Sequence, residues 1–228
     1  MKLLYIANIR LPTEKAHGIQ IMNTMRAFSQ SGRVDSTLIV PRRFNPIKKD
    51  PFLYYDLDKT FPIIRLPVAD LMPFPFFRSL WFWLESATFS VAVTVYALFE
   101  KEAVFYTRDF LVAFLLSLFR KRIFYEIHTM PKRARFFHIF AWKRSAGVVS
   151  ISHGIKKELE RLGISEKKIL VAPDAVDISR FNPASSKEEA RRQIGLPREK
   201  KIILYAGHLY EWKGVATLVE AAKQLDED

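Results

Sequence analysis

Glu126 and His128 are the first candidates for chemistry in this sequence. They lie at the end of the apolar run Ile123–Ile127, which predicts a buried strand, and residues two apart in a strand point to the same face. An imidazole can donate or accept a hydrogen bond and titrates near neutrality, so we predict that His128 is catalytic, with Glu126 and Arg108 as neighbours in the active site. Since an isolated histidine is more often structural, that role stays the alternative at this point.

The loop from Asn8 to Gly18 joins a predicted strand to a predicted helix and contains His17, which we also count as an active-site neighbour. A glycine lets a ligand approach the backbone, and a helix N-terminus favours negative charge. We therefore expect Gly18 to contact an anionic ligand, with a simple turn glycine as the alternative. The loop lacks the GxGxxG spacing, so a dinucleotide cofactor is not predicted.

A second glycine-containing loop runs from Gly207 to Gly214 and opens a predicted helix. It contains His208 and Lys213. Backbone access at the glycines, a cation and a helix N-terminus together suit a diphosphate, and we expect the loop to bind one. The order of residues is not that of a Walker A loop. A helix-capping loop with a solvated lysine is the alternative.

Short apolar runs alternate with helix-period stretches along the whole chain. In the helical stretches apolar residues recur at intervals of three and four, as at Ile21, Met25 and Phe28. This alternation predicts parallel strands with helices on both faces, the doubly wound, Rossmann-like α/β class. The predicted strands are Lys2–Ala7, Ser36–Val40, Ile63–Leu66, Ala103–Tyr106, Ile123–Ile127, Gly147–Ile151, Lys168–Ala172 and Lys201–Ala206.

A domain boundary is predicted at residue 180, inside a stretch punctuated by prolines. Residues 1–180 form the larger domain, and residues 181–228 form a linker and the first strand-helix unit of a second one. In the linker, Ser186 and Glu189 have the pattern of a capping box, and Gly195 ends the short helix. Because one strand and one helix cannot bury a core of their own, we expect the second domain to be incomplete.

Composition favours a cytoplasmic protein with an anionic partner. The 228 residues include no cysteine, which excludes disulfides, thiolate catalysis and cysteine-based metal sites and fits a reducing compartment. The first apolar run is too short for a signal peptide. The net charge of +12 suits an anionic substrate beside an anionic membrane surface. No nucleic-acid-binding module is recognised, so binding to DNA or RNA is not predicted.

The aromatic stretch Phe74–Phe99 is the strongest membrane candidate, but Arg78, Glu85, Ser86 and further polar residues interrupt it. A spanning helix needs about 20 nearly uncharged apolar residues. We therefore predict a buried or interfacial helix, whose aromatic residues touch a lipid surface from the cytoplasmic side.

Taken in order, these segments resemble the GT-B glycosyltransferases of family 4, the group 1 type, over nearly the whole chain. That family has a strand, a glycine-containing loop and a helix, then a strand ending in Glu-x-His, and a strand ending in Ser before a helix. A Pro-Asn-Gly-Val-Asp-x-x-x-Phe-x-Pro segment and a Gly-Arg-Leu…Lys-Gly segment follow. The matching residues here are Leu3–Phe28, Glu126 and His128, Val148–Ser152, Pro173–Asp177 with Phe181 and Pro183, and Gly207–Leu209 with Lys213 and Gly214.

The resemblance implies an enzyme that transfers a sugar from a nucleotide-sugar donor to a glycan or lipid-linked acceptor. It implies retention of anomeric configuration, no metal or other cofactor, and a place in the synthesis of cell-surface polysaccharide or glycolipid. Residues 1–180 would be the N-terminal, acceptor-side domain of the GT-B fold, with His128 facing the donor sugar and the leaving phosphate. The donor-binding residues would be Gly18, Gly207, His208, Lys213 and Gly214.

Two features separate this chain from the family pattern. His208 replaces an arginine, and a histidine is only partly charged at neutral pH, so we expect weaker diphosphate binding. The Glu-rich donor segment of the family would lie beyond Asp228, so we expect this chain alone to be inactive. The competing interpretations are a non-catalytic module that binds an acceptor or a membrane through Phe74–Trp83, and a nucleic-acid-binding protein.

Overall fold

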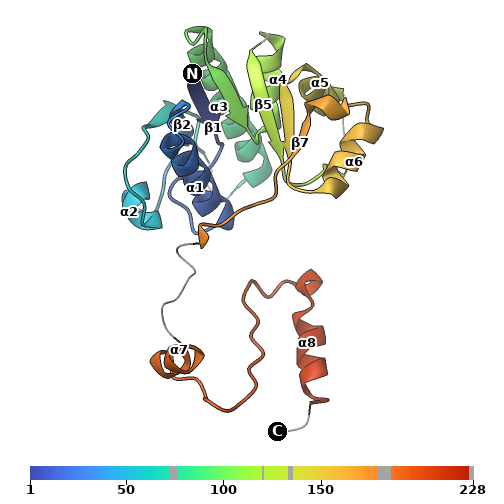
Figure 1. Cartoon of the computed structure of the whole chain (residues 1–228). Helices are drawn as coiled ribbons and strands as arrows, with labels where there is room; N and C mark the ends of the chain where they lie inside the picture. Colours follow the sequence, from blue (N-terminus) through green and yellow to red (C-terminus); the bar gives the residue numbers. More distant parts are fainter. Residues whose placement is uncertain (72–75, 120, 133–135, 179–185, 226–228) are drawn as a thin grey trace. The chain divides into compact units, whose positions relative to one another are not determined.

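The computed structural model divides the chain into two compact units, Met1–Val176 and Asp177–Asp228 (Figure 1). It describes residues 1–71, 76–119, 121–132, 136–178 and 186–225. Part of the aromatic stretch Phe74–Phe99, and the motif residues Phe181 and Pro183, lie outside the described residues. The second unit begins at residue 177, whereas the sequence analysis placed the start of the second domain at residue 181.

The first unit is built on one sheet of seven parallel strands in the order β3-β2-β1-β4-β5-β6-β7. The predicted strands of this unit are confirmed to within two residues at their ends. Runs of apolar residues that are buried on both faces are typical of parallel strands, which explains why they were recognisable. The strands are β1 (Lys2–Ile6), β2 (Asp35–Arg42), β3 (Ile63–Pro67), β4 (Val104–Thr107), β5 (Arg122–Ile127), β6 (Gly147–Ser150) and β7 (Ile169–Val171).

Helices cover both faces of the sheet, as the doubly wound class requires. On one face, α1 and α2 pack against the side chains of Tyr5, Leu38 and Val40. On the other face, α3 to α6 contribute to a larger core that includes Phe89 and Trp142. The helices are α1 (Ala16–Gln30), α2 (Pro51–Tyr55), α3 (Arg78–Leu98), α4 (Phe110–Leu118), α5 (Phe136–Arg144) and α6 (His153–Arg161), with a 3-10 turn η1 (Glu166–Lys168) before β7.

The order of the strands reverses between β1 and β4. From β1 the chain runs outward through β2 to β3, then crosses back to β4 and continues outward to β7. Such a switch point leaves a crevice at the carboxyl ends of the two central strands, because their connections leave on opposite faces. The fold therefore places the residues that follow β1 and β4, with those after the neighbouring β5, around one opening.

Helix α3 has one buried face and one exposed apolar face. The buried face includes the polar side chains of Glu85, Ser86 and Ser90, which agrees with the predicted buried helix. Ser79–Leu98 is long and apolar enough to cross a membrane, but 39% of that window is buried inside the first unit, and core helices pass the same test. The exposed face carries Leu80, Phe82, Trp83, Val91, Val95 and Leu98.

The second unit contains α7 (Lys187–Gln193), the 3-10 turn η3 (Glu211–Lys213) and α8 (Val215–Ala222). The Ser186 hydroxyl accepts a hydrogen bond from the Glu189 backbone N–H and caps α7, as its sequence pattern predicted. The strand predicted at Lys201–Ala206 was wrong, since these residues form no ladder. A strand needs a neighbour to bond its backbone groups, and none of the described residues of this unit supplies one or is fully buried.

Candidate functional site

A cavity of about 530 Å³ lies at the switch point of the first unit. Its walls come from the residues that follow β1, β4 and β5 and from the first turns of α1. The polar residues of its lining are Asn8, His17, Gln20, Arg108, Asp109, Glu126, His128 and Thr129. The structure therefore brings together four of the predicted site residues, which are His17, Arg108, Glu126 and His128.

Arg108 and Glu126 form a bidentate pair at the floor of this site. The Arg108 Nε and Nη2 groups donate to the two carboxylate oxygens of Glu126 at 3.1 and 3.0 Å. The side chains are 18% and 8% exposed, so water screens the pair weakly. A planar guanidinium that binds both oxygens of a carboxylate fixes the orientation of each partner.

Further donors surround the Glu126 carboxylate. The Tyr5 hydroxyl lies 3.4 Å from Oε2, and Tyr106 also hydrogen-bonds to the carboxylate. Burial alone would raise the pKa of Glu126, but hydrogen bonds from His128 and Tyr106 and the charge of Arg108 outweigh it. The pKa of Glu126 therefore lies below its usual range, and the group is an anion at neutral pH.

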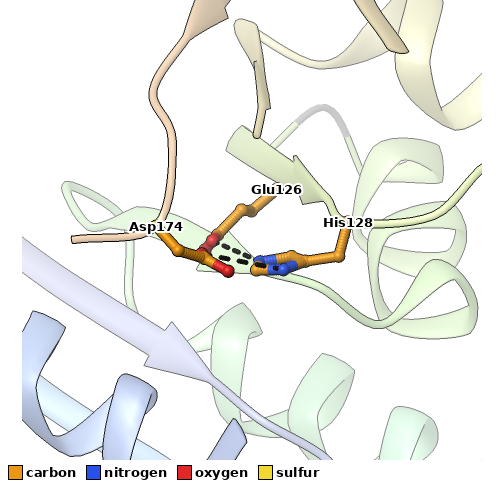
Figure 2. Close-up of side chains that lie close together, drawn as sticks. All are labelled: Glu126, His128 and Asp174. Atoms are coloured by element: carbon orange, nitrogen blue, oxygen red, sulfur yellow. Dashed lines mark hydrogen bonds and ion pairs between the residues drawn. The ribbon is translucent and has the colours of Figure 1, made fainter. Parts of the chain in front are cut away.

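The ionised Glu126 determines which nitrogen of His128 carries a proton. Glu126 Oε1 lies 2.6 Å from His128 Nε2, and a carboxylate can only accept, so Nε2 carries the hydrogen. The other ring nitrogen, Nδ1, lies 3.8 Å from Asp174 Oδ1 (Figure 2). The prediction that Glu126 and His128 share one face of the β5 end is confirmed by this contact.

Gln20 of α1 connects Arg108 to Asp174. Its Oε1 accepts from Arg108 Nη1 at 3.0 Å, and its Nε2 donates to Asp174 Oδ1. The five side chains thus form a closed ring of polar contacts drawn from α1, the ends of β4 and β5, and the segment after β7. We call this ring the β5 network; its members are Gln20, Arg108, Glu126, His128 and Asp174.

His17 and Gly18 lie side by side in the chain but in different surroundings. His17 lines the cavity, and burial together with the cations Lys15 and Arg108 lowers its pKa, so it is neutral at pH 7. Gly18 is buried and does not line the cavity. A Cβ at Gly18 would overlap the hydroxyl of Tyr55 and lie 2.6 Å from Thr13 Cγ2. Close packing thus requires glycine here, and its contact with a donor stays a prediction.

The predicted phosphate loop of the second unit is exposed. Gly214 has a φ of 71°, a left-handed conformation that favours glycine, and it precedes the first residue of α8. Lys213 Nζ lies 4.4 Å from the centre of the Trp212 ring. The Tyr205 hydroxyl donates to the His208 carbonyl at 2.8 Å, across Gly207. The loop has the predicted connection to a helix, and its role in phosphate binding stays a prediction.

A second polar cluster lies on the α3 side of the same sheet edge. Asn8 Nδ2 donates to Glu85 Oε2 at 3.3 Å and to Ser86 Oγ at 3.2 Å. Arg43 lies 3.8 Å from both the Glu85 and the Asp70 carboxylates. Burial raises the pKa of Glu85, whose side chain is fully buried. We call this cluster the α3 network; its members are Asn8, Arg43, Asp70, Glu85 and Ser86.

Glu126, His128 and Asp174 also have the residue types of a metal site, with ligand atoms within 4.8 Å of one another. Arg108, however, already binds both oxygens of Glu126. A divalent ion at this place would face the guanidinium charge, so the group fits a hydrogen-bonded network better than a metal site.

Four residues of the site were not predicted as site residues: Gln20, Asn8, Asp109 and Asp174. Asn8 and Asp109 follow the ends of β1 and β4, so the rule that singled out His128 at the end of β5 would have found them. Asp174 belongs to the Pro173–Asp177 segment of the family resemblance, but its contact with Gln20 had no local signal, because the two residues meet across 154 residues of sequence.

No family model matches the chain. It is 33% identical over 92 residues to TuaC of Bacillus subtilis, a protein named for teichuronic acid biosynthesis glycosyltransferase activity, covering 38% of the chain and 23% of TuaC. It is 31% identical over 97 residues to an Escherichia coli UDP-Gal:alpha-D-GlcNAc-diphosphoundecaprenol alpha-1,3-galactosyltransferase, covering 41% of the chain and 25% of that protein. The matches thus span a quarter or less of the length of these two relatives.

Solved structures extend the similarity over the chain. Sucrose-phosphate synthase from Thermosynechococcus elongatus matches 99% of it with a TM-score of 0.70 at 16% identity, over 60% of that chain. HepE from Anabaena in complex with UDP-glucose matches 100% of it with a TM-score of 0.65 at 16% identity, over 58% of that chain. The chain resembles the GT-B glycosyltransferases in both sequence and fold. The resemblance predicted from the motifs is confirmed.

The fold alone does not separate transferases from all other enzymes. A UDP-GlcNAc 2-epimerase from Methanocaldococcus jannaschii matches 75% of the chain with a TM-score of 0.53 at 18% identity, over 45% of that chain. At such identities a structural match shows the GT-B type of fold and leaves the reaction open. The glycosyltransferase resemblance in sequence, together with the site itself, must therefore support the function.

Proposed function

We propose that the chain is part of a glycosyltransferase that transfers a sugar from a nucleotide-sugar donor to a glycan or lipid-linked acceptor. We assign it to the synthesis of cell-surface polysaccharide or glycolipid. The supporting observation is the β5 network in the switch-point cavity, where a fixed histidine lies beside a neutralised arginine-glutamate pair. The teichuronic acid and diphosphoundecaprenol relatives support the class of acceptor.

We assign roles in the transfer to three side chains of the β5 network. The bond between the anomeric carbon and the diphosphate oxygen breaks, the acceptor oxygen bonds to that carbon, and the acceptor proton passes to the departing diphosphate oxygen. His128 would face the donor sugar and the departing phosphate, and its unprotonated Nδ1 would accept a hydrogen bond from a sugar hydroxyl, since Nε2 donates to Glu126. Glu126 and Arg108 are positioning residues that hold the imidazole in one tautomer.

The proposal also covers the anomeric configuration of the product and the residues that contact the diphosphate. We propose retention, in which the acceptor attacks the face from which the diphosphate leaves. We propose that Lys213, His208 and the Gly207 and Gly214 backbone bind the diphosphate without a metal ion. The exposure of Lys213, next to the N-terminus of α8, supports a role as a phosphate ligand.

We also propose that transfer needs a larger donor-binding domain than residues 177–228 provide. None of the described residues in this unit is fully buried, and its apolar side chains at Leu204, Leu209 and Trp212 are largely exposed. Comparing nucleotide-sugar turnover by this chain with turnover by the product of the whole gene tests this part. Equal turnover by the two proteins would refute it.

The test of the main proposal uses a panel of UDP-, GDP- and ADP-sugars with the product of the whole gene. Release of nucleoside diphosphate is measured in the presence of lipid-linked and soluble glycan acceptors. His128→Ala should lower turnover by about 100-fold, the loss expected when a group that positions the substrate is removed. His153→Ala, on the exposed first turn of α6, is the matched control and should leave turnover unchanged. Failure to bind or turn over any donor would contradict the proposal.

A further inference from the structure

The first turns of α3, α4 and α5 carry aromatic side chains at one edge of the sheet. In a parallel sheet, the helix that follows a strand begins at the carboxyl end of that strand, and these three helices follow β3, β4 and β5. Helix α4 contacts both α3 and α5, and all three contribute to the core on the same face of the sheet. Their first turns therefore lie at the carboxyl edge, which is also the edge of the switch-point cavity.

Ring contacts join these first turns into one group. The centre of the Trp83 ring in α3 lies 6.2 Å from that of Phe110, the first residue of α4. The Phe110 ring in turn lies 6.4 Å from that of Phe137 in α5. Phe110 directly follows Asp109, which lines the cavity, so the group begins beside the proposed site. We call it the aromatic rim; its members are Phe77, Phe82, Trp83, Phe110, Phe136 and Phe137.

Much of the aromatic rim is open to solvent. Phe77 and Phe136 are each 73% exposed, and the side chains of Phe82 and Trp83 are half-exposed. Phe77 also has a φ of 57°, a left-handed conformation that costs free energy for a bulky residue. Local backbone preference therefore does not explain why its ring is held in solvent. Exposed apolar side chains gathered in this way are typical of a surface that contacts a partner.

The charges around the aromatic rim favour an anionic partner. Glu85 is the only acidic residue in the sequences of α3, α4 and α5, and its side chain is fully buried. Lys132 is exposed in the loop before α5, and the Arg144 guanidinium lies 5.2 Å from the centre of the Phe140 ring. A second copy of this chain would bring like charges together, without an exposed acid on these helices to pair with them. Aromatic rings beside lysine and arginine suit an anionic lipid surface instead.

We propose that the aromatic rim inserts into an anionic lipid bilayer and that this contact delivers a lipid-linked acceptor to the switch-point cavity. The delivery rests on the proposed function, whereas the contact with lipid does not. Because the rim and the cavity share one edge of the sheet, a head group at the bilayer surface lies on the side where the cavity is formed. An acceptor anchored in the bilayer then reaches the cavity by diffusing in the plane of the lipid. The inference selects lipid-linked acceptors over soluble glycans.

The first experiment measures sedimentation of the unmodified chain with phosphatidylglycerol vesicles. Replacing both Phe77 and Phe136 with serine should weaken binding about 30-fold, because two exposed rings lose their contact with lipid. Phe99→Ser is the matched control and should leave binding unchanged. Phe99 is 82% exposed and follows the last residue of the same helix α3, at the opposite edge of the sheet. Vesicles of phosphatidylcholine alone should bind the unmodified chain more weakly, since they carry no net charge.

Two further measurements separate insertion of the rim from other contacts. Brominated lipids should quench the tryptophan fluorescence of the unmodified chain, and Trp83→Phe should lose most of that quenching. Unchanged quenching, equal vesicle binding by the double serine variant, or an equal loss of binding in Phe99→Ser would each overturn the proposal. Sedimentation equilibrium without lipid tests for a second copy. A dimer that dissociates in the double serine variant would assign the rim to self-association and overturn the lipid contact.

The delivery of the acceptor is tested with the product of the whole gene. The double serine variant should raise the KM for a lipid-linked acceptor in vesicles about tenfold and leave kcat unchanged. Its turnover of a water-soluble acceptor should equal that of the unmodified enzyme, since the rim lies outside the β5 network. Equal KM values for the lipid-linked acceptor would overturn the delivery. If no acceptor is turned over by either enzyme, the proposed function and the delivery fail together, whereas vesicle binding through the rim still stands.

Discussion

Two buried carboxylates at the same sheet edge, Glu126 and Glu85, are held in opposite ways. In the β5 network, Glu126 receives two hydrogen bonds from Arg108, and its pKa is lowered. In the α3 network, Glu85 lies 3.8 Å from Arg43 without a hydrogen bond, and burial raises its pKa. An arginine in the vicinity is therefore not sufficient to keep a buried carboxylate charged. The geometry of the pair decides, because burial and pairing oppose each other.

The two networks also differ in whether their buried polar atoms have hydrogen-bond partners. In the α3 network, Asn8 Oδ1, Asp70 Oδ1 and Glu85 Oε1 are buried and accept no hydrogen bond from the described residues. No atom of the β5 network is in that position among the described residues. A fully satisfied network is rigid, and rigidity is what a group that orients a substrate needs. The comparison thus supports the proposal that the chemistry takes place at Glu126 and His128.

The largest expected effect comes from removing each arginine in turn. Arg108→Met leaves the Glu126 anion buried without its cation, and we expect a loss of about 3–5 kcal/mol in the free energy of unfolding. Arg43→Met should cost only about 1–2 kcal/mol, because Glu85 accepts a proton more readily and loses no hydrogen bond to the arginine. Urea unfolding at pH 7 measures both values. Equal losses of unfolding free energy in the two variants would show that Arg108 and Arg43 stabilise their networks to the same extent.

The sequence predicted the β5 network in part. Glu126 and His128 were found because the two-residue period of a strand places them on one face whatever the rest of the fold does. Asp174 and Gln20 were not found, because their contact depends on how the segment after β7 packs against α1. The contact of Gly18 with a ligand stays a prediction, but the nearby Tyr55 hydroxyl, which leaves no room for a Cβ at this position, is a neighbour that no local pattern indicates.

The prediction of strands from the sequence has the same limit. Seven strands of the first unit were predicted from apolar runs, and each has a parallel neighbour. The run Lys201–Ala206 has an equally apolar sequence and forms no strand in the described second unit. Local composition decides which residues can form a strand, but the hydrogen bonds of the ladder come from another segment, which the run itself does not specify.

We expect an effect of intermediate size when Glu126 or Glu85 is replaced with glutamine and the stability of each variant is measured against pH. The pKa of Glu126 is lowered in the folded state, so its contribution is present above the unfolded value of about 4.3 and is lost as pH falls. Glu126→Gln should therefore be less stable than the unmodified chain at pH 7, with the difference shrinking below about pH 4.

The contribution of Glu85 to stability should change with pH in the opposite direction. Its pKa is raised, so the unmodified chain loses stability as pH rises above the unfolded value of about 4.3. Glu85→Gln removes this loss, and its melting temperature relative to the unmodified chain should rise between pH 4 and pH 8. Thermal melting in buffers across that range checks both variants. Parallel pH curves for the two variants would contradict the assignment of opposite pKa shifts.

The smallest effect concerns the outer face of α3, the helix that carries Glu85 on its inner face. Phe82 and Trp83 are 48% and 50% exposed there, and we propose that they contact an anionic membrane while the acceptor is bound. Replacing both with serine should weaken binding to phosphatidylglycerol vesicles about tenfold without changing the pH curves above, since these side chains lie outside both networks. Leu53→Ser, on α2, removes an exposed apolar side chain from the opposite face of the sheet and should leave vesicle binding intact. Sedimentation with vesicles at several salt concentrations measures the effect. If the α3 variant binds as tightly as the unmodified chain, the exposed face of α3 is not the lipid contact.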